Sequence, residues 1–93
     1  MREPWEVELD VQKQVFPNLS PTVQGDLRDD FQVGEPTYVI TDAIAYAADE
    51  RVPIAAELIA DIRATILPEA DGRLYEVLSE SLSALENQPV VEW

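Results

Sequence analysis

The chain has 93 residues and a formal net charge of −13, from 19 acidic and 6 basic side chains. This length allows one domain with one hydrophobic core. The chain contains no cysteine and no histidine, which excludes disulfides, thiolate nucleophiles, the usual zinc sites and histidine-based acid–base catalysis. Because the hydrophobic fraction of 46% is ordinary for a folded protein, we expect residues 1–93 to form a single domain.

The charge also limits the classes of partner. Binding to nucleic-acid phosphates requires clustered lysine and arginine, so direct binding of DNA or RNA is not expected. A basic protein is the natural partner, although the charge could serve only solubility or reflect a halophilic source. No charge-free apolar run approaches the roughly 18 residues of a membrane span, and MREPWEVELD lacks the apolar core of a signal peptide. We therefore expect a soluble, cytoplasmic protein with no membrane partner.

Two patterns compete in the first segment of the chain. Val7, Leu9 and Val11 alternate with acidic residues, which is the period of a half-buried strand. Val7, Val11 and Val15 have helical spacing. Since tryptophan and valine favour strands, we predict a short strand over residues 5–11, which could pair with the C-terminal tail.

A helix is predicted to begin at Pro21 and to extend to about residue 31. Ser20 can cap this helix, and proline suits its first position because the missing N–H leaves no bond unmade. One apolar stripe follows at spacings of four: Leu19, Val23, Leu27 and Phe31. Gly34 can end the helix in a left-handed conformation and Pro36 can start the next one. The two helices should therefore meet at a sharp corner.

The next helix, from Pro36 to about Glu50, should be covered on more than one side. Between Pro36 and Ala48 it carries a single charge, Asp42, and apolar residues occupy most of its circumference. Pro53 then breaks the chain and can begin a helix with apolar residues at 54, 58, 62 and 66. After a turn at residues 67–72, leucines 74, 78, 82 and 85 predict a last helix. We predict an all-α bundle of four to five short helices, with the N-terminal strand as its one β element.

The available chemistry does not favour an enzyme. Neighbouring carboxylates such as Asp29 and Asp30 diverge on a helix, so they form neither a catalytic pair nor a metal site. The glycines are isolated and form no phosphate-binding loop. The helix of residues 54–66 offers Arg63 alone for DNA recognition. We expect no catalytic residue, no metal and no cofactor.

A protein-binding surface is the remaining class of site. Three aspartates lie at i, i+3 and i+4 on one helix, where like charges repel and a cation on a partner would relieve the cost. The predicted partner-binding residues are Asp26, Asp29, Asp30, Glu35, Tyr38 and Asp42. Tyr38 is expected to be more exposed than Tyr46. The alternative is a solvated face without a partner. Trp5 is expected to pack against the bundle, and Trp93 could either pack or anchor an interface.

The segment DLRDDFQVGEPTYVITDAIAYAADERVPIAAELIADI, residues 26–62, resembles the small acidic helical immunity proteins of bacterial polymorphic-toxin systems, in particular the MafI-like group. The parts that carry the resemblance are an acidic helix, a corner, a helix ending in acidic residues, a Val-Pro break and a further helix. In this chain these parts are 26–31, Gly34-Glu35-Pro36, 40–50, Val52-Pro53 and 57–62. The alternating start and the VVEW tail depart from the pattern.

The resemblance implies a role and no catalytic residues. Such proteins neutralise a cognate toxin, often a nuclease, by covering its active site or an adjacent exosite. Physical reasoning agrees in part, because an acidic surface can steer rapidly to a basic cleft. Two alternatives stay open: an acidic nucleic-acid mimic that blocks a DNA-binding protein, and a structural or oligomerisation module. A homodimer is compatible with each.

Overall fold

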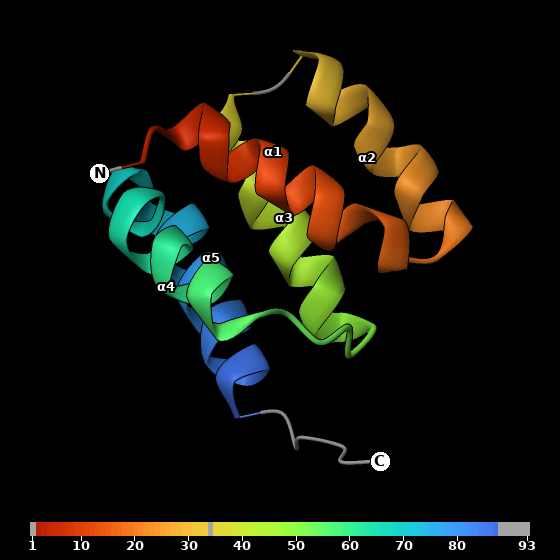
Figure 1. Ribbon diagram of the computed structural model, residues 1–93. Coiled ribbons are helices and arrows are strands. Elements are labelled where there is room, and N and C mark those ends of the chain that lie inside the picture. The colour runs from red at the N-terminus through yellow and green to blue at the C-terminus, as the bar shows by residue number, and fades with distance from the viewer. Residues whose placement is uncertain (1, 34, 88–93) are drawn as a thin grey trace.

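Five α-helices make up the computed structural model, which describes residues 2–33 and 35–87 (Figure 1). They are α1 (Pro4–Gln14), α2 (Pro21–Val33), α3 (Pro36–Asp49), α4 (Ala56–Thr65) and α5 (Gly72–Glu86). Two short 3₁₀ turns, Phe16–Asn18 and Leu67–Glu69, follow α1 and α4. The predicted all-α bundle is confirmed. None of the helices in the described ranges has both the length and the apolar character that crossing a bilayer requires.

The first segment is helix α1, so the predicted strand over residues 5–11 is wrong. The Glu3 backbone N–H donates to the Glu6 carboxylate at 3.1 Å, as part of a capping box, and Pro4 stands in the first turn. Val7, Val11 and Val15 are fully buried along one side. A helix satisfies its backbone groups internally, whereas a lone strand needs a neighbour. The proposed neighbour, the C-terminal tail, lies outside the described residues.

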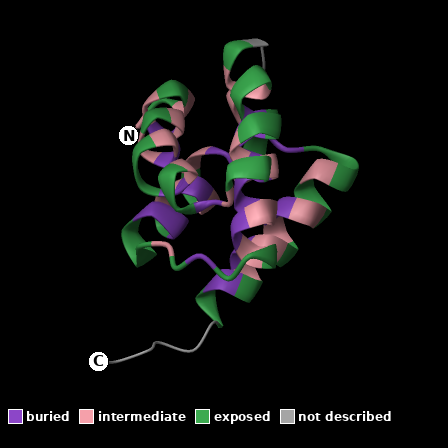
Figure 2. Ribbon diagram, turned by 90° about the vertical axis from the view of Figure 1, so that its right-hand side faces the viewer, coloured by how far each residue is buried: buried purple, intermediate pink, exposed green. Residues whose placement is uncertain are grey.

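Helix α3 lies at the centre of the bundle and packs against α1, α2 and α5. Its fully buried apolar residues are Val39, Ile40, Ala43, Ile44 and Ala47. Thr41 is also buried, and its hydroxyl donates a hydrogen bond to the Thr37 carbonyl at 2.7 Å, so this buried polar side chain has a partner. Figure 2 shows buried residues on the inner sides of the helices and exposed residues outside. The prediction that this helix is covered on more than one side is confirmed.

The connection from α3 to α4 is longer than predicted. Arg51 takes a left-handed φ of 57°, and the Val52 N–H donates to the Ala47 carbonyl at 2.8 Å, which closes α3 in a Schellman-type end. Val52 is buried, so it anchors the connection in the core. Helical bonding resumes only where the Ala55 carbonyl accepts from the Ile59 N–H at 3.1 Å. Helix α4 therefore begins at Ala56 rather than near Pro53, and Gly34, the other predicted corner, lies outside the described residues.

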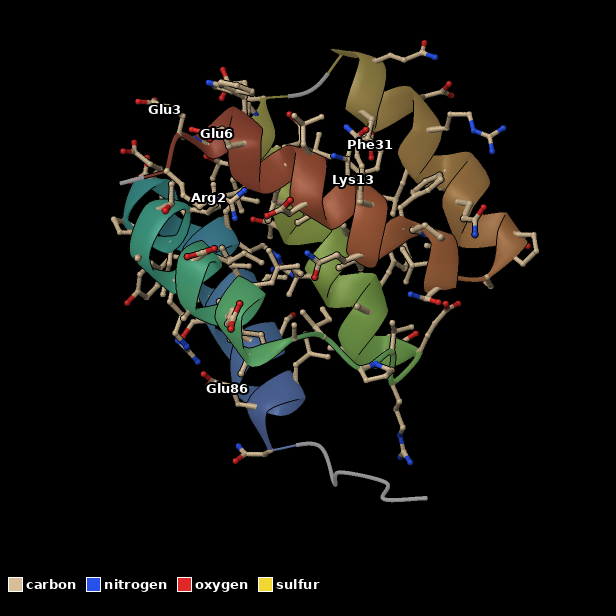
Figure 3. The ribbon with its side chains drawn as sticks, viewed as in Figure 1. Arg2, Glu3, Glu6, Lys13, Phe31 and Glu86 are labelled. Carbon is tan, nitrogen blue, oxygen red and sulfur yellow. The ribbon has the colours of Figure 1, made fainter. Side chains whose placement is uncertain are left out.

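Two arginines join the helices on the α4 side of the bundle. The Arg2 guanidinium lies 2.9 Å from the Asp61 carboxylate of α4 and also pairs with Asp10 of α1. Arg63 of α4 donates to Glu86 of α5 at 2.6 Å. Figure 3 shows Arg2 where α1 approaches α4, and Glu86 near the end of α5. These contacts fix α4 against its neighbours on both sides.

The aromatic residues near the chain ends do not behave as predicted. Trp5 is 58% exposed, so the expectation that it packs against the bundle is wrong. The reason is that the side of α1 facing the core is already filled by its three valines, and Trp5 falls on the other side. Trp93 lies outside the described residues.

Candidate functional site

Helices α2 and α3 form an antiparallel pair whose register is defined by two side-chain contacts. At one end the Glu50 carboxylate accepts the Ser20 backbone N–H at 2.8 Å and also the Ser20 hydroxyl. Toward the C-terminal end of α2, Asp30 lies beside Asp42 in the middle of α3, close enough for a hydrogen bond between the two carboxyl groups. This register places Asp26 of α2 opposite the C-terminal half of α3.

Most of the charge of this helix pair has one sign. Residues 20–50 carry seven carboxylates and one arginine. We use the name acidic face for five of these carboxylates: Asp26, Asp29 and Asp30 on α2, and Asp42 and Asp49 on α3. Arg28 lies on another flank of α2, where it lines a pocket with Gln12 of α1 and with Phe16 of the following 3₁₀ turn. Arg2 and Arg63 pair with acids of α1, α4 and α5. The acidic face is therefore a region of negative potential.

The contact between Asp30 and Asp42 is electrostatically unfavourable. Burial raises the pKa of Asp42 above its ordinary value of 3.8, and the neighbouring Asp30 raises it further by its charge and by a hydrogen bond. Both effects disfavour the ionised carboxylate of Asp42 in the folded protein. A cation placed between these two side chains would remove much of the cost, so the site is suited to a positively charged group.

A shallow pocket on α3 adjoins this contact. It has a volume of about 270 Å³ and is lined by Asp42, Ala45, Tyr46 and Asp49. The two carboxylates can pair with a basic side chain, and the ring of Tyr46 can stack on its cationic head. Asp49 was not among the predicted partner-binding residues. Its spacing of seven from Asp42 corresponds to two helical turns and was the available signal.

The predicted partner-binding residues fall into two groups. Asp30 and Asp42 are brought together across the two helices. The others are exposed on one helix each or just before it: Asp26 and Asp29 on α2, Glu35 before α3, and Tyr38 on the first turn of α3. Tyr38 is 50% exposed, which confirms that it is more exposed than the half-buried Tyr46. In the described ranges no three carboxylates are arranged to hold a metal ion.

Comparisons of the chain with protein-family models, with curated proteins and with solved structures found no match. The resemblance to MafI-like immunity proteins therefore stays a prediction from the sequence. The geometry and charge of the acidic face are the observations on which a functional proposal can stand.

Proposed function

We propose that this chain is an immunity protein that binds and neutralises a cognate toxin domain with a basic surface, such as a nuclease. The observation that carries the proposal is the acidic face, where Asp30 and Asp42 are held together at an electrostatic cost. A cationic side chain on a partner would relieve this cost on binding. The resemblance of residues 26–62 to immunity proteins supports the same role.

The mechanism is occlusion and involves no chemical step by this chain. A nuclease that binds phosphates has a basic cleft, and complementary charge accelerates its encounter with an acidic surface. On contact, a basic side chain of the toxin would enter the pocket between Asp42 and Asp49 and stack on Tyr46. The bound protein then excludes the nucleic acid from the cleft.

A direct test is binding to the protein encoded by the gene immediately upstream, which the proposal identifies as the toxin. We expect a 1:1 complex, loss of toxicity on co-expression, and an association rate that falls steeply as the salt concentration rises. Removing two of the five charges of the acidic face, with Asp30→Asn and Asp42→Asn, should slow association roughly tenfold or more.

The matched control removes two exposed charges elsewhere, with Glu57→Gln on α4 and Glu80→Gln on α5. Both side chains are exposed, and the net charge changes by the same amount as in the test variant. If the control slows association as much as the test variant does, net charge alone steers the encounter and the acidic face is not the binding site. If the upstream product does not bind at all, the proposed role is wrong.

A further inference from the structure

Helix α1 carries an unpartnered apolar stripe on the side opposite its buried valines. Trp5 and Leu9 lie one turn apart on this side and are 58% and 42% exposed. Phe16, just after the end of α1, falls on the same side by helical spacing and is half-buried. Large apolar side chains grouped on the surface of so charged a chain indicate an interaction surface.

A pocket opens at the far end of this stripe, between α1 and α2. It measures about 350 Å³ and is lined by Gln12 and Phe16 from the α1 side and by Arg28, Phe31 and Gln32 from α2. The rings of Phe16 and Phe31 meet edge to face, with centroids 5.5 Å apart and planes at 77°. Figure 3 shows Phe31 on the side of α2 that faces α1. Aromatic walls beside a guanidinium are suited to an indole ring.

Two opposite charges flank the stripe. Glu6 and Lys13 are seven residues apart, or two helical turns, and so lie on one flank of α1 (Figure 3). In a twofold pair of identical antiparallel helices, residue i of one copy meets residue j of the other, and j meets i. A register that brings Glu6 opposite Lys13 of the other copy satisfies both ion pairs at once.

The same register joins the stripe to the pocket. Where position 6 meets position 13, position 5 meets position 14, so Trp5 lies opposite a position between Gln12 and Phe16, which both line the pocket. Leu9 then meets position 10 of the other copy, next to the twofold axis. One alignment of two helices therefore pairs the charges, places an indole at each pocket and covers the exposed leucine.

We propose that a second copy of this chain docks on α1, with the two α1 helices antiparallel and Trp5 of each copy in the Phe16–Phe31 pocket of the other. A second copy fits better than an unrelated protein because one antiparallel register brings Trp5 to the pocket and Glu6 to Lys13 at the same time. Along α2, Asp26 and Asp30 lie on a different flank from Arg28, so the dimer leaves the acidic face accessible. The proposal does not depend on the proposed function.

Salt should affect this dimer in the opposite direction from binding to a basic partner. Each copy has a net charge of −13, so two copies repel each other at long range, and screening weakens that repulsion. The dimer should therefore strengthen as salt is raised, while a complex formed through the acidic face should weaken.

Sedimentation equilibrium of the purified chain tests the proposal. We expect the mass to rise from the monomer value of 10.4 kDa to twice that value as concentration increases. Trp5→Ala should lower the association constant roughly tenfold or more, because an interface tryptophan in a pocket is a typical hot spot. Tyr75→Ala, which removes a 47% exposed aromatic from α5, should leave the constant unchanged. A monomer at every concentration up to about 1 mM would overturn the proposal, as would equal effects of the two variants.

A charge exchange tests the register. Glu6→Lys and Lys13→Glu should each weaken self-association, because each places like charges opposite one another. Mixing the two variants in equal amounts should produce a heterodimer tighter than either homodimer, since opposite charges then meet at both positions. The lysine introduced at position 6 of one variant faces the glutamate introduced at position 13 of the other, and the native Lys13 of the first faces the native Glu6 of the second. If net charge alone governed self-association, the affinity of the heterodimer would lie between those of the two homodimers. That result would refute the register. Circular dichroism checks that Glu6→Lys, which loses the capping bond to Glu3, keeps its helices.

Discussion

Replacing Asp42 with asparagine should stabilise the folded protein at neutral pH. The substitution keeps the size of the side chain and its ability to hydrogen-bond with Asp30, and it removes one of two adjacent negative charges. Two unit charges about 4 Å apart repel by about 1 kcal/mol in water and about 4 kcal/mol at an effective dielectric constant of 20. Asp30 and Asp42 are both partly exposed, so solvent screening limits the gain to about 0.5–1 kcal/mol. For a domain of this size, that gain raises Tm by about 2–8 °C.

The gain should depend on pH in a defined direction. The pKa of Asp42 is raised in the folded protein, so between the ordinary value of 3.8 and the raised value the folded protein binds more protons than the unfolded chain. Wild-type stability therefore falls as pH rises through this range. The advantage of Asp42→Asn should be complete above the raised pKa and absent below 3.8, where both proteins are neutral at this position.

Urea unfolding, followed by circular dichroism at neutral pH and at about pH 3, measures both effects. Asp29→Asn on the exposed side of α2 is the control for the loss of one charge, and it should change the free energy of unfolding by less than about 0.5 kcal/mol. The reasoning is refuted if Asp42→Asn fails to stabilise the protein at neutral pH, or if its advantage persists in acid.

Three further predictions concern the bundle itself. Ile44→Ala, at a fully buried position of α3, should lower the free energy of unfolding by about 2–5 kcal/mol, and a smaller loss in urea unfolding would indicate that the core relaxes into the space. Gly25→Ala should raise the free energy of unfolding by about 0.5–1 kcal/mol, because an added Cβ inside α2 meets no atom within 4 Å. A lower Tm of the variant in thermal unfolding would show instead that the added methyl group distorts α2. Glu50→Gln should destabilise the protein at neutral pH. The hydrogen bonds from Ser20 lower the pKa of Glu50 below 4.5. The stability that these bonds give is therefore present above pH 4.5 and is lost as pH falls through the folded pKa. The free energies of unfolding of the wild type and the variant should converge at acid pH.

The interior of the fold was predictable where one apolar period had no competitor. In α3 the apolar residues permit only a helix, and Ile40, Ala43 and Ile44 are buried as that pattern requires. Residues 5–11 allowed two periods, and intrinsic strand preference favoured the wrong one. The better signals were Pro4 at the start of the helix and the capping box formed by the glutamates at positions 3 and 6. Both indicate how the backbone is hydrogen-bonded, whereas strand preference describes only the side chains.

The candidate site was predictable only within each helix. The i, i+3 and i+4 spacing of the α2 aspartates follows from helix geometry alone. The approach of Asp30 to Asp42 depends on the register between α2 and α3, which contacts such as Ser20 with Glu50 determine. The pocket between Phe16 and Phe31 likewise depends on how α1 and α2 cross. A spacing rule within one helix contains no information about such distances between helices.

The central position of α3 has a consequence for how the protein would meet a partner. Amides in a helix enclosed by three others exchange with solvent only through the largest openings of the fold, so α3 should be among the last segments to take up deuterium. Asp42 and Asp49 are attached to this slowly opening helix. A ligand of the acidic face would therefore meet a preorganised surface and lose little conformational entropy on binding.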